Sequence, residues 1–190
     1  MPRLFPILSV IVAALASAVP AVRAETITFN NLVGPQALVV NTYTEGSYTV
    51  TSSLGAWGQD HGFGNPVPSI FSSSSSASID VTLTGGGNFI FNSVDLGNGG
   101  AGSPSFFIQG FLNNNWNLGI SSSLPASNAF FTVPTYDNTI QIDTLRITMG
   151  VNDTNFFNVD NINVGAAVPE PASLMLLGSA IVPMLLRRRR

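Results

Sequence analysis

Asp160, in the last strand-like segment before the C-terminal tail, is the carboxylate whose position most strongly indicates chemistry. Segment 156–164 alternates like a strand, and if Ile162 and Val164 face the core, the two-residue period places Asp160 on the same side. An inward carboxylate must be paired, hydrogen-bonded or bound to a metal. Arg146 is the only basic residue between positions 25 and 167. The candidate partners are therefore calcium, which prefers oxygen ligands, and backbone amides, which would make Asp160 a structural residue.

Three aromatic residues, Trp57, Trp116 and Tyr136, are candidates for stacking on a sugar ring. Sugar rings present apolar C–H faces to aromatic rings, and neighbouring amides supply hydrogen bonds. Trp116 lies between Asn115 and Asn117, in a polar turn where a core tryptophan is less expected. The alternative is burial, which is the more frequent fate of a large aromatic side chain. We predict glycan stacking at Trp57 and Trp116.

The sequence offers little for catalysis. His61 follows Asp60 in a glycine-rich segment that is typical of an exposed loop, and no Gly-x-Ser-x-Gly elbow accompanies it. The chain has no cysteine and no lysine, which excludes a thiol nucleophile and a Schiff base. A small glycan hydrolase would need two carboxylates roughly 5–10 Å apart in a cleft. We predict no catalytic residues and no enzymatic activity, and keep the hydrolase as a third hypothesis.

Charge is scarce and unevenly distributed. Only 9% of the 190 residues are charged, against 45% apolar, with 18 glycines and 12 prolines. Six of the seven arginines lie near the two ends, so the middle of the chain has one arginine against nine acids and a net charge near −8. Such a body cannot neutralise a row of phosphates, which excludes nucleic acid as a partner.

The middle of the chain must position the candidate residues on strands. Short β-prone runs are separated by turns rich in Gly, Asn, Ser and Pro, and no segment shows helical periodicity over ten residues. The predicted strands are 26–29, 47–52, 78–84, 88–96, 105–112, 116–120, 129–133, 139–149 and 156–164. In segment 139–149 the alternation changes phase near Asp143, which predicts a bulge or bend. The pattern predicts one all-β domain over residues 25–165, a β-sandwich or jelly roll.

The N-terminal residues 1–24 have the features of a secretory signal peptide. Arg3 precedes an apolar run, and Val22 and Ala24 stand at positions −3 and −1 of a cleavage site before Glu25. We therefore predict a signal helix that targets the protein for export.

The C-terminal residues combine three features in order: a Val-Pro-Glu-Pro motif, a 15-residue apolar stretch and an arginine cluster. The stretch predicts a marginal transmembrane helix, since a span usually takes roughly 17–25 residues. Arginines accumulate on the cytoplasmic side, so the sandwich is expected outside. The motif is Val168, Pro169, Glu170 and Pro171, and the cluster is Arg187, Arg188, Arg189 and Arg190.

This arrangement of residues 168–190 resembles the PEP-CTERM sorting signal, also called the ice-binding protein C-terminal domain. The resemblance implies a bacterium that makes exopolysaccharide, and an exosortase-type transpeptidase that recognises Pro169-Glu170-Pro171 and processes the protein there. It implies anchoring in the inner membrane before processing and a cell-surface or extracellular location afterwards. The label about ice refers to the tail and implies nothing about the sandwich.

Segment Phe157-Asn158-Val159-Asp160-Asn161-Ile162 also resembles the closing strand of calcium-containing, carbohydrate-binding jelly rolls. The opening strand 26–29, followed by Glu45-Gly46, is compatible with that family, although Asn30 stands where the family often has an acid. The resemblance implies a calcium ligand at Asp160.

The sequence thus predicts an exported protein of the bacterial surface or biofilm matrix. Its expected role is structural or adhesive within exopolysaccharide, with no certain cofactor. The alternative is a calcium-stabilised, lectin-like carbohydrate-binding module. Exposed tryptophans facing a groove would favour the lectin, whereas buried tryptophans and a featureless polar surface would favour the structural role.

Overall fold

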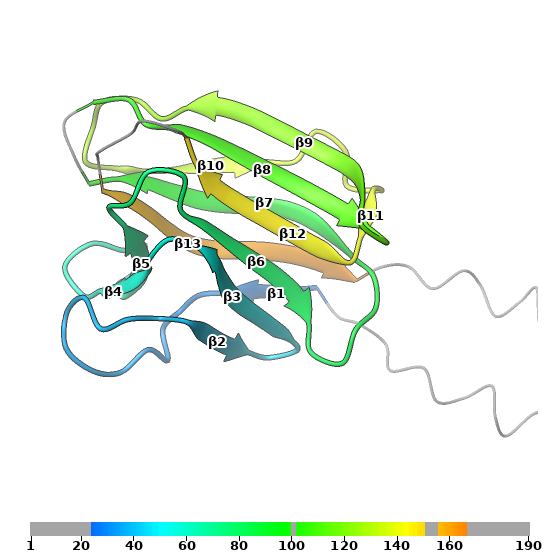
Figure 1. The fold of residues 1–190 in the computed structure, drawn as a ribbon, viewed down its shortest axis with the longest axis horizontal. Coiled ribbons are helices and arrows are strands. Elements are labelled where there is room, and N and C mark those ends of the chain that lie inside the picture. The colour runs from blue at the N-terminus through cyan, green and yellow to red at the C-terminus, as the bar shows by residue number, and fades with distance from the viewer. Residues whose placement is uncertain (1–23, 100–101, 151–155, 167–190) are drawn as a thin grey trace, which may run out of the picture. The chain divides into compact units, whose positions relative to one another are not determined.

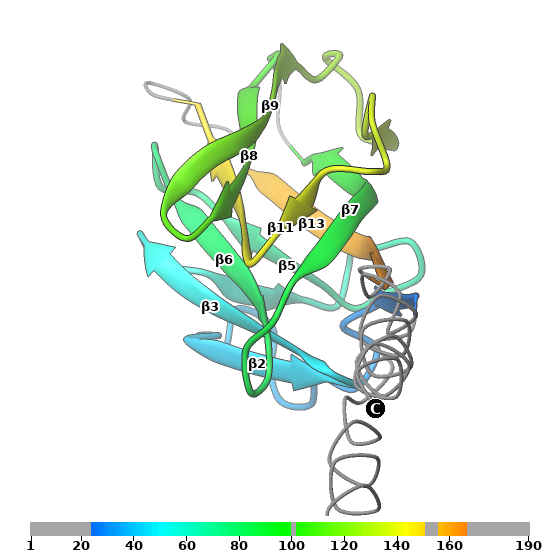
Figure 2. The same cartoon turned by 90° about the vertical axis from the view of Figure 1, so that its right-hand side faces the viewer.

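The computed structural model describes residues 24–99, 102–150 and 156–166, which form two antiparallel β-sheets packed face to face. Figure 1 shows one layer in front of the other, and Figure 2 shows the two layers from the side. No helix occurs in these residues. The predicted all-β sandwich is therefore confirmed.

The seven-stranded sheet has the order β10-β7-β13-β5-β4, with β1 paired to β13 and β11 paired to β7. Its centre is β13, which pairs with β7 on one side and with β5 and β1 on the other. The strands of this sheet are β1 (Glu25–Ile27), β4 (Gly58–Asp60), β5 (Ser69–Ser72), β7 (Phe89–Asn98), β10 (Phe130–Pro134), β11 (Gln141–Ile142) and β13 (Phe157–Ala166).

The six-stranded sheet has the order β2-β3-β6-β12-β8-β9. Its alternation is regular: in β6, Ile79, Val81 and Leu83 are buried in the core while Asp80 points outward and pairs with Arg146 of β12. The strands of this sheet are β2 (Thr42–Glu45), β3 (Tyr48–Leu54), β6 (Ser78–Leu83), β8 (Ser105–Leu112), β9 (Asn115–Ser123) and β12 (Thr144–Met149).

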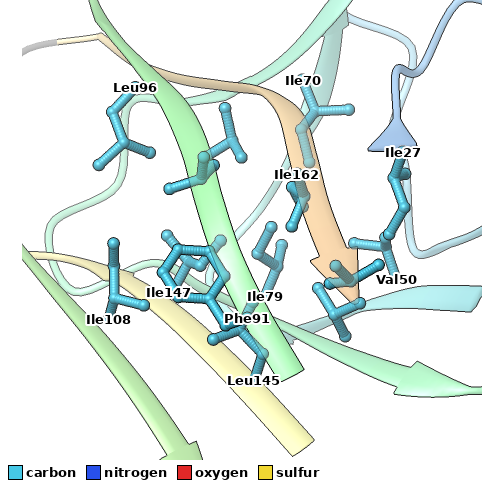
Figure 3. Packing of buried hydrophobic residues seen from close by; sticks show 14 of the residues in the cluster. Ile27, Val50, Ile70, Ile79, Phe91, Leu96, Ile108, Leu145, Ile147 and Ile162 are labelled. Atoms are coloured by element: carbon cyan, nitrogen blue, oxygen red, sulfur yellow. The ribbon is translucent and has the colours of Figure 1, made fainter. Parts of the chain in front are cut away.

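The core lies between the two sheets, as Figure 3 shows. Both inner faces supply branched apolar side chains and Phe, and fully burying each one stabilises the fold by about 1.5–3 kcal/mol. The labelled side chains are Ile27, Ile70, Phe91, Leu96 and Ile162 from the seven-stranded sheet and Val50, Ile79, Ile108, Leu145 and Ile147 from the six-stranded sheet.

All nine predicted strands coincide with observed strands, within shifts of a few residues at their ends. Segment 139–149 divides at Asp143 into β11 and β12, which pair in different sheets, so the predicted phase change marks a change of sheet. Three strands, β2, β4 and β5, were not predicted, because they have only three or four residues and no apolar alternation.

The prediction that Asp160 shares the side of Ile162 is wrong, and the reason is a bulge in β13. The pairing with β7 shifts register between Asp160 and Asn163, and Asn161 has a φ of 43°. Phe157 and Val159 face the core before the bulge, and Ile162 faces it after the bulge. Asp160 therefore lies on the outer side of the sheet, where a loop buries it.

The predicted signal helix lies outside the described residues, apart from Ala24, and so does the whole of the predicted segment 168–190 with its transmembrane helix. In the part of the chain that the structure covers, no helix has the length and apolarity to cross a membrane.

Candidate glycan-binding groove

A groove of about 350 Å³ lies on the outer side of the seven-stranded sheet, beside the start of β13. Segments far apart in the sequence meet there, from strands β4, β5 and β13 and from the loops near them. We call it the aromatic groove; its lining residues are Gln36, Asp60, Phe63, Phe71, Gly99, Asn128, Phe156 and Asn158.

Phenylalanine side chains form much of the groove wall. Phe71 pairs with Asn158 in the β5–β13 register, and its ring lies over Gly58, where an added Cβ would be 3.1 Å from the ring. The Phe156 ring is half exposed (50%) and lies 5.7 Å from the Phe71 ring. On the other side of Asn158, Phe63 stacks on Phe130 with ring centroids 4.6 Å apart. These rings offer apolar faces close to polar groups.

Gly97 allows Phe63 to take this position. Gly97 pairs with Asn158 in the β7–β13 register, and a Cβ there would come within 2.7 Å of the Phe63 ring and 2.9 Å of the Phe130 ring. A side chain at position 97 would therefore displace one wall of the aromatic groove.

The polar centre of the groove is Asp60. Its Oδ1 accepts hydrogen bonds from Gln36 Nε2 (3.0 Å), Gly62 N (2.9 Å) and Phe63 N (3.1 Å), and its Oδ2 accepts one from Asn158 Nδ2 (2.9 Å). Burial opposes ionisation of Asp60, but these hydrogen bonds outweigh it and hold the pKa of Asp60 below its usual value. Asp60 is therefore ionised at neutral pH.

Asn158, beside Asp60, has one side-chain oxygen that accepts no hydrogen bond. Its Nδ2 donates to Asp60 Oδ2 and to Ser69 Oγ (3.1 Å), while its Oδ1 is buried and unpaired. Oδ1 lies 3.3 Å from the position of a Cβ built on Gly99, which also lines the groove. Leaving a buried acceptor unpaired costs about 1–3 kcal/mol, so this atom would gain from a donor.

The loop 61–68 covers the outer side of β13, and Asp160 is one of the residues that anchor it. Asp160 is fully buried (0% exposed) and accepts hydrogen bonds from Asn65 N (2.6 Å) and Asn161 N (2.8 Å). Asp95 pairs with Asp160 in the register and accepts hydrogen bonds from Asn65 Nδ2 (3.1 Å), Asn161 Nδ2 (2.9 Å) and Thr132 Oγ1 (2.6 Å). The two carboxylates thereby fix the loop that carries Phe63.

Of the two partners predicted for Asp160, the structure shows backbone amides. Each of its carboxylate oxygens takes one N–H, and nearby Glu45 is likewise occupied by Thr28 N, Phe29 N and Tyr43 OH. Calcium takes six to eight oxygen ligands. Among the described residues no three Asp, Glu, His or Cys side chains gather in a way that could hold a metal. The described side chains around Asp160 therefore do not fit a calcium ion.

Stability is expected to fall as the pH rises from about 4 to about 7, because of Asp160. Burial raises the pKa of Asp160 to about 6, although the two N–H groups favour the carboxylate, and the charges of Asp95 and Glu45 add to the rise. The folded state holds this proton where the unfolded chain releases it, so ionisation destabilises the fold by up to about 3 kcal/mol. Urea unfolding of the full chain at pH 4.5 and 7.5 measures the change. Asp160→Asn should lose this part of the pH dependence, and an equal pH dependence in both proteins would contradict the assignment.

The two tryptophans have opposite environments. Trp57 is buried (1% exposed), its ring meets Phe157 edge-on and its Nε1 donates to Ser78 O (3.2 Å). A sugar has no access to that ring, so the structure gives no support to glycan stacking at Trp57. Trp116 is 68% exposed and lies over Gly119 on the six-stranded sheet, away from the residues that line the aromatic groove. Stacking at Trp116 stays a prediction.

A second, more open groove of about 500 Å³ is lined by Asn92, Thr135, Tyr136 and Asn138. Tyr136, which the sequence suggested as a candidate for stacking on a sugar ring, is exposed. The side chains around it can form hydrogen bonds. The described residues that line this groove include one aromatic ring and no charged side chain, so it is the simpler of the two sites.

Within the part of the chain that the structure describes, the lining of the two grooves contains one carboxylate, Asp60, and no second one to form an acid–base pair. His61 is exposed and its Nε2 lies 3.0 Å from Gln59 Oε1. Asp95 and Asp160 are neighbours, but the loop 61–68 buries both.

Sequence reasoning missed the aromatic groove. Phe63, Phe71 and Phe156 were not among the predicted site residues, because most phenylalanines are expected in the core. The available signal was alternation: Ile70 and Phe157 face the core, so their neighbours Phe71 and Phe156 must face outward.

The described residues thus form a β-sandwich that has an aromatic, acidic groove on its surface. Residues 167–190 match the family model described as the PEP-CTERM protein-sorting motif. The chain thus carries the sorting motif of an exported protein that is processed by exosortase and sorted through its C-terminal segment. No curated protein matches the chain.

Solved structures similar to the sandwich include carbohydrate-binding modules. The family 32 module of NanJ from C. perfringens, in complex with galactose, has 16% identity and a TM-score of 0.41 over 60% of this chain and 93% of that chain. The CBM32 of AlyQ, in complex with 4,5-unsaturated mannuronic acid, has 14% identity and a TM-score of 0.41 over 69% and 98%. The CBM22-1 xylan-binding domain of Xyn10C from Paenibacillus barcinonensis has 10% identity and a TM-score of 0.43 over 79% and 98%.

Proposed function

We propose that this protein is a non-catalytic surface adhesin that binds glycans in the aromatic groove and so associates with the exopolysaccharide matrix of a biofilm. The observation that carries the proposal is the convergence of Phe71, Phe156 and Asp60 in one surface groove, where the buried Asn158 holds Asp60. Apolar ring faces next to a few fixed polar groups suit a sugar, which has both C–H faces and hydroxyls.

We also propose how the protein is exported, anchored and processed. The signal peptide directs export, and the C-terminal helix holds the protein in the inner membrane until the exosortase-type enzyme acts at Pro169-Glu170-Pro171. Arg187–Arg190 remain on the cytoplasmic side as a stop. The processed protein then reaches the cell surface or the matrix.

Phe156→Ala should weaken glycan binding roughly tenfold or more, because it removes the exposed ring without emptying the core. Calorimetry of the full chain with neutral, N-acetylated, aminated and uronate oligosaccharides measures the effect. Phe107→Ala is the matched control, since Phe107 is similarly exposed but lies on the six-stranded sheet. Equal affinities of wild type and Phe156→Ala would contradict the groove as the site.

The second candidate is binding on the face that carries Trp116, which is supported by the 68% exposure of that ring. The outer side of the six-stranded sheet there also presents Phe111, whose ring lies 5.7 Å from the Arg146 guanidinium carbon. Loss of binding in Trp116→Ala, with Phe156→Ala unaffected, would move the site to this face.

A further inference from the structure

We propose that the aromatic groove selects sugars that carry a protonated amine, such as glucosamine units in a partly deacetylated polymer, over sugars that carry carboxylate or sulfate. This inference rests on the proposed function and names its ligand class. It follows from the charge, the free acceptor capacity and the rings of the groove.

Among the described residues that line the groove, Asp60 is the only charged one. The only arginine between positions 25 and 167, Arg146, is held by Asp80 at 2.7 Å on the other sheet. The middle of the chain has nine acids against this one arginine. An anionic sugar would meet Asp60 without a compensating cation, whereas an ammonium group would be attracted.

The acceptor capacity at the centre of the groove is only partly used. Asp60 Oδ1 is saturated by three hydrogen bonds, whereas Oδ2 accepts only one, from Asn158 Nδ2. An oxygen of a carboxylate has about two acceptor sites, so Oδ2 has one left for a ligand. Asn158 Oδ1 next to it also has no donor, but it is buried, so it adds negative potential near the groove without being a contact surface. A primary ammonium has three N–H donors and no acceptor, so it matches this acceptor-rich centre better than a group with oxygens only.

The rings add a second reason for a cation. The Phe71 and Phe156 rings meet at 54°, with centroids 5.7 Å apart, and form a corner beside the carboxylate. A cation within about 6 Å of a ring face gains from the ring quadrupole. A corner of two rings next to Asp60 therefore favours an ammonium over a neutral hydroxyl.

The test compares two ligands that share one backbone: the hexamer of glucosamine and the hexamer of N-acetylglucosamine, titrated into the full chain at pH 5.5 and low salt. We expect the aminated hexamer to bind about tenfold more tightly, an advantage that shrinks in added NaCl. A glucuronate oligomer should bind more weakly than either.

Asp60→Asn removes the charge at nearly constant size. The oxygen of the new amide can keep the three donors that Oδ1 now accepts, and a flip of the Asn158 amide would place its unpaired Oδ1 against the new NH2 group. This variant should bind both hexamers within about twofold of each other. The control is Asp143→Asn, which removes one charge at a surface carboxylate outside the groove that accepts Asn113 N, and it should keep the preference.

The outcomes separate the two proposals. If both hexamers bind equally well to wild type and Phe156→Ala binds neither, the proposed function stands and the selection for an amine is overturned. If the amine preference survives in Asp60→Asn but fades in Asp143→Asn, general attraction by an acidic protein explains it, which also overturns the inference. If no oligosaccharide binds, both proposals fail.

Discussion

Asp160→Ala should destabilise the full chain by about 2–4 kcal/mol at pH 4.5, where Asp160 does not carry the cost of ionisation. The carboxyl group is fully buried and accepts hydrogen bonds from Asn65 N and Asn161 N, and alanine would leave both N–H groups without this partner. The loop 61–68 would lose one of its hydrogen bonds to β13. Guanidinium unfolding with the change in midpoint measures the loss.

Asp143→Ala is the matched control for this prediction. Its carboxylate also accepts a backbone N–H, from Asn113 at 2.6 Å, but at an exposed position where water can replace it. We expect a change below about 1 kcal/mol. If Asp160→Ala were no more destabilising than Asp143→Ala, the loop would not depend on the buried carboxylate.

Trp57→Ala should be more destabilising still, at about 3–5 kcal/mol. Alanine would leave a large cavity beside Phe157 and free the carbonyl of Ser78, and a buried aromatic replaced by alanine typically costs this much. Thermal unfolding followed by far-ultraviolet circular dichroism measures it. A loss of glycan binding without a loss of stability would instead restore Trp57 to a surface role.

Trp116→Ala provides the contrast within the same residue type. The ring is mostly exposed and rests on Gly119, with Nε1 donating to Leu118 O (2.5 Å). We expect less than about 1 kcal/mol of destabilisation. Equal losses for the two tryptophans would contradict their placement.

The sandwich itself could be predicted from the sequence because its strands follow the two-residue period. β6 and β12 show this most clearly, with Ile79, Val81, Leu145 and Ile147 buried in alternation with polar residues. Strand order could not be predicted, because it depends on pairing between distant segments such as β1 and β13. Neither could the short strands β4 and β5, whose neighbours provide most of their stabilisation.

The environment of Asp160 shows where the periodic pattern fails. A single bulge at Asn161 reverses which residues face the core, and nothing in the alternation of the preceding residues marks it. The sequence correctly predicted that the Asp160 carboxylate needs a partner, but it did not predict on which side of the sheet Asp160 lies. The aromatic groove was missed for a related reason: its residues come from segments as distant as Gln36 and Asn158, which only the folded sheet brings together.

The most direct test of the central claim is to locate a bound glycan on the protein by nuclear magnetic resonance. The full chain, labelled with nitrogen-15, is titrated with the glucosamine and N-acetylglucosamine hexamers. We predict that the largest amide shifts occur at Gly62, Phe63, Gly99 and Asn158, around the aromatic groove. Shifts confined to the face that carries Trp116, or to the second groove, which Tyr136 lines, would contradict glycan binding in the aromatic groove. The absence of any shift would contradict it as well.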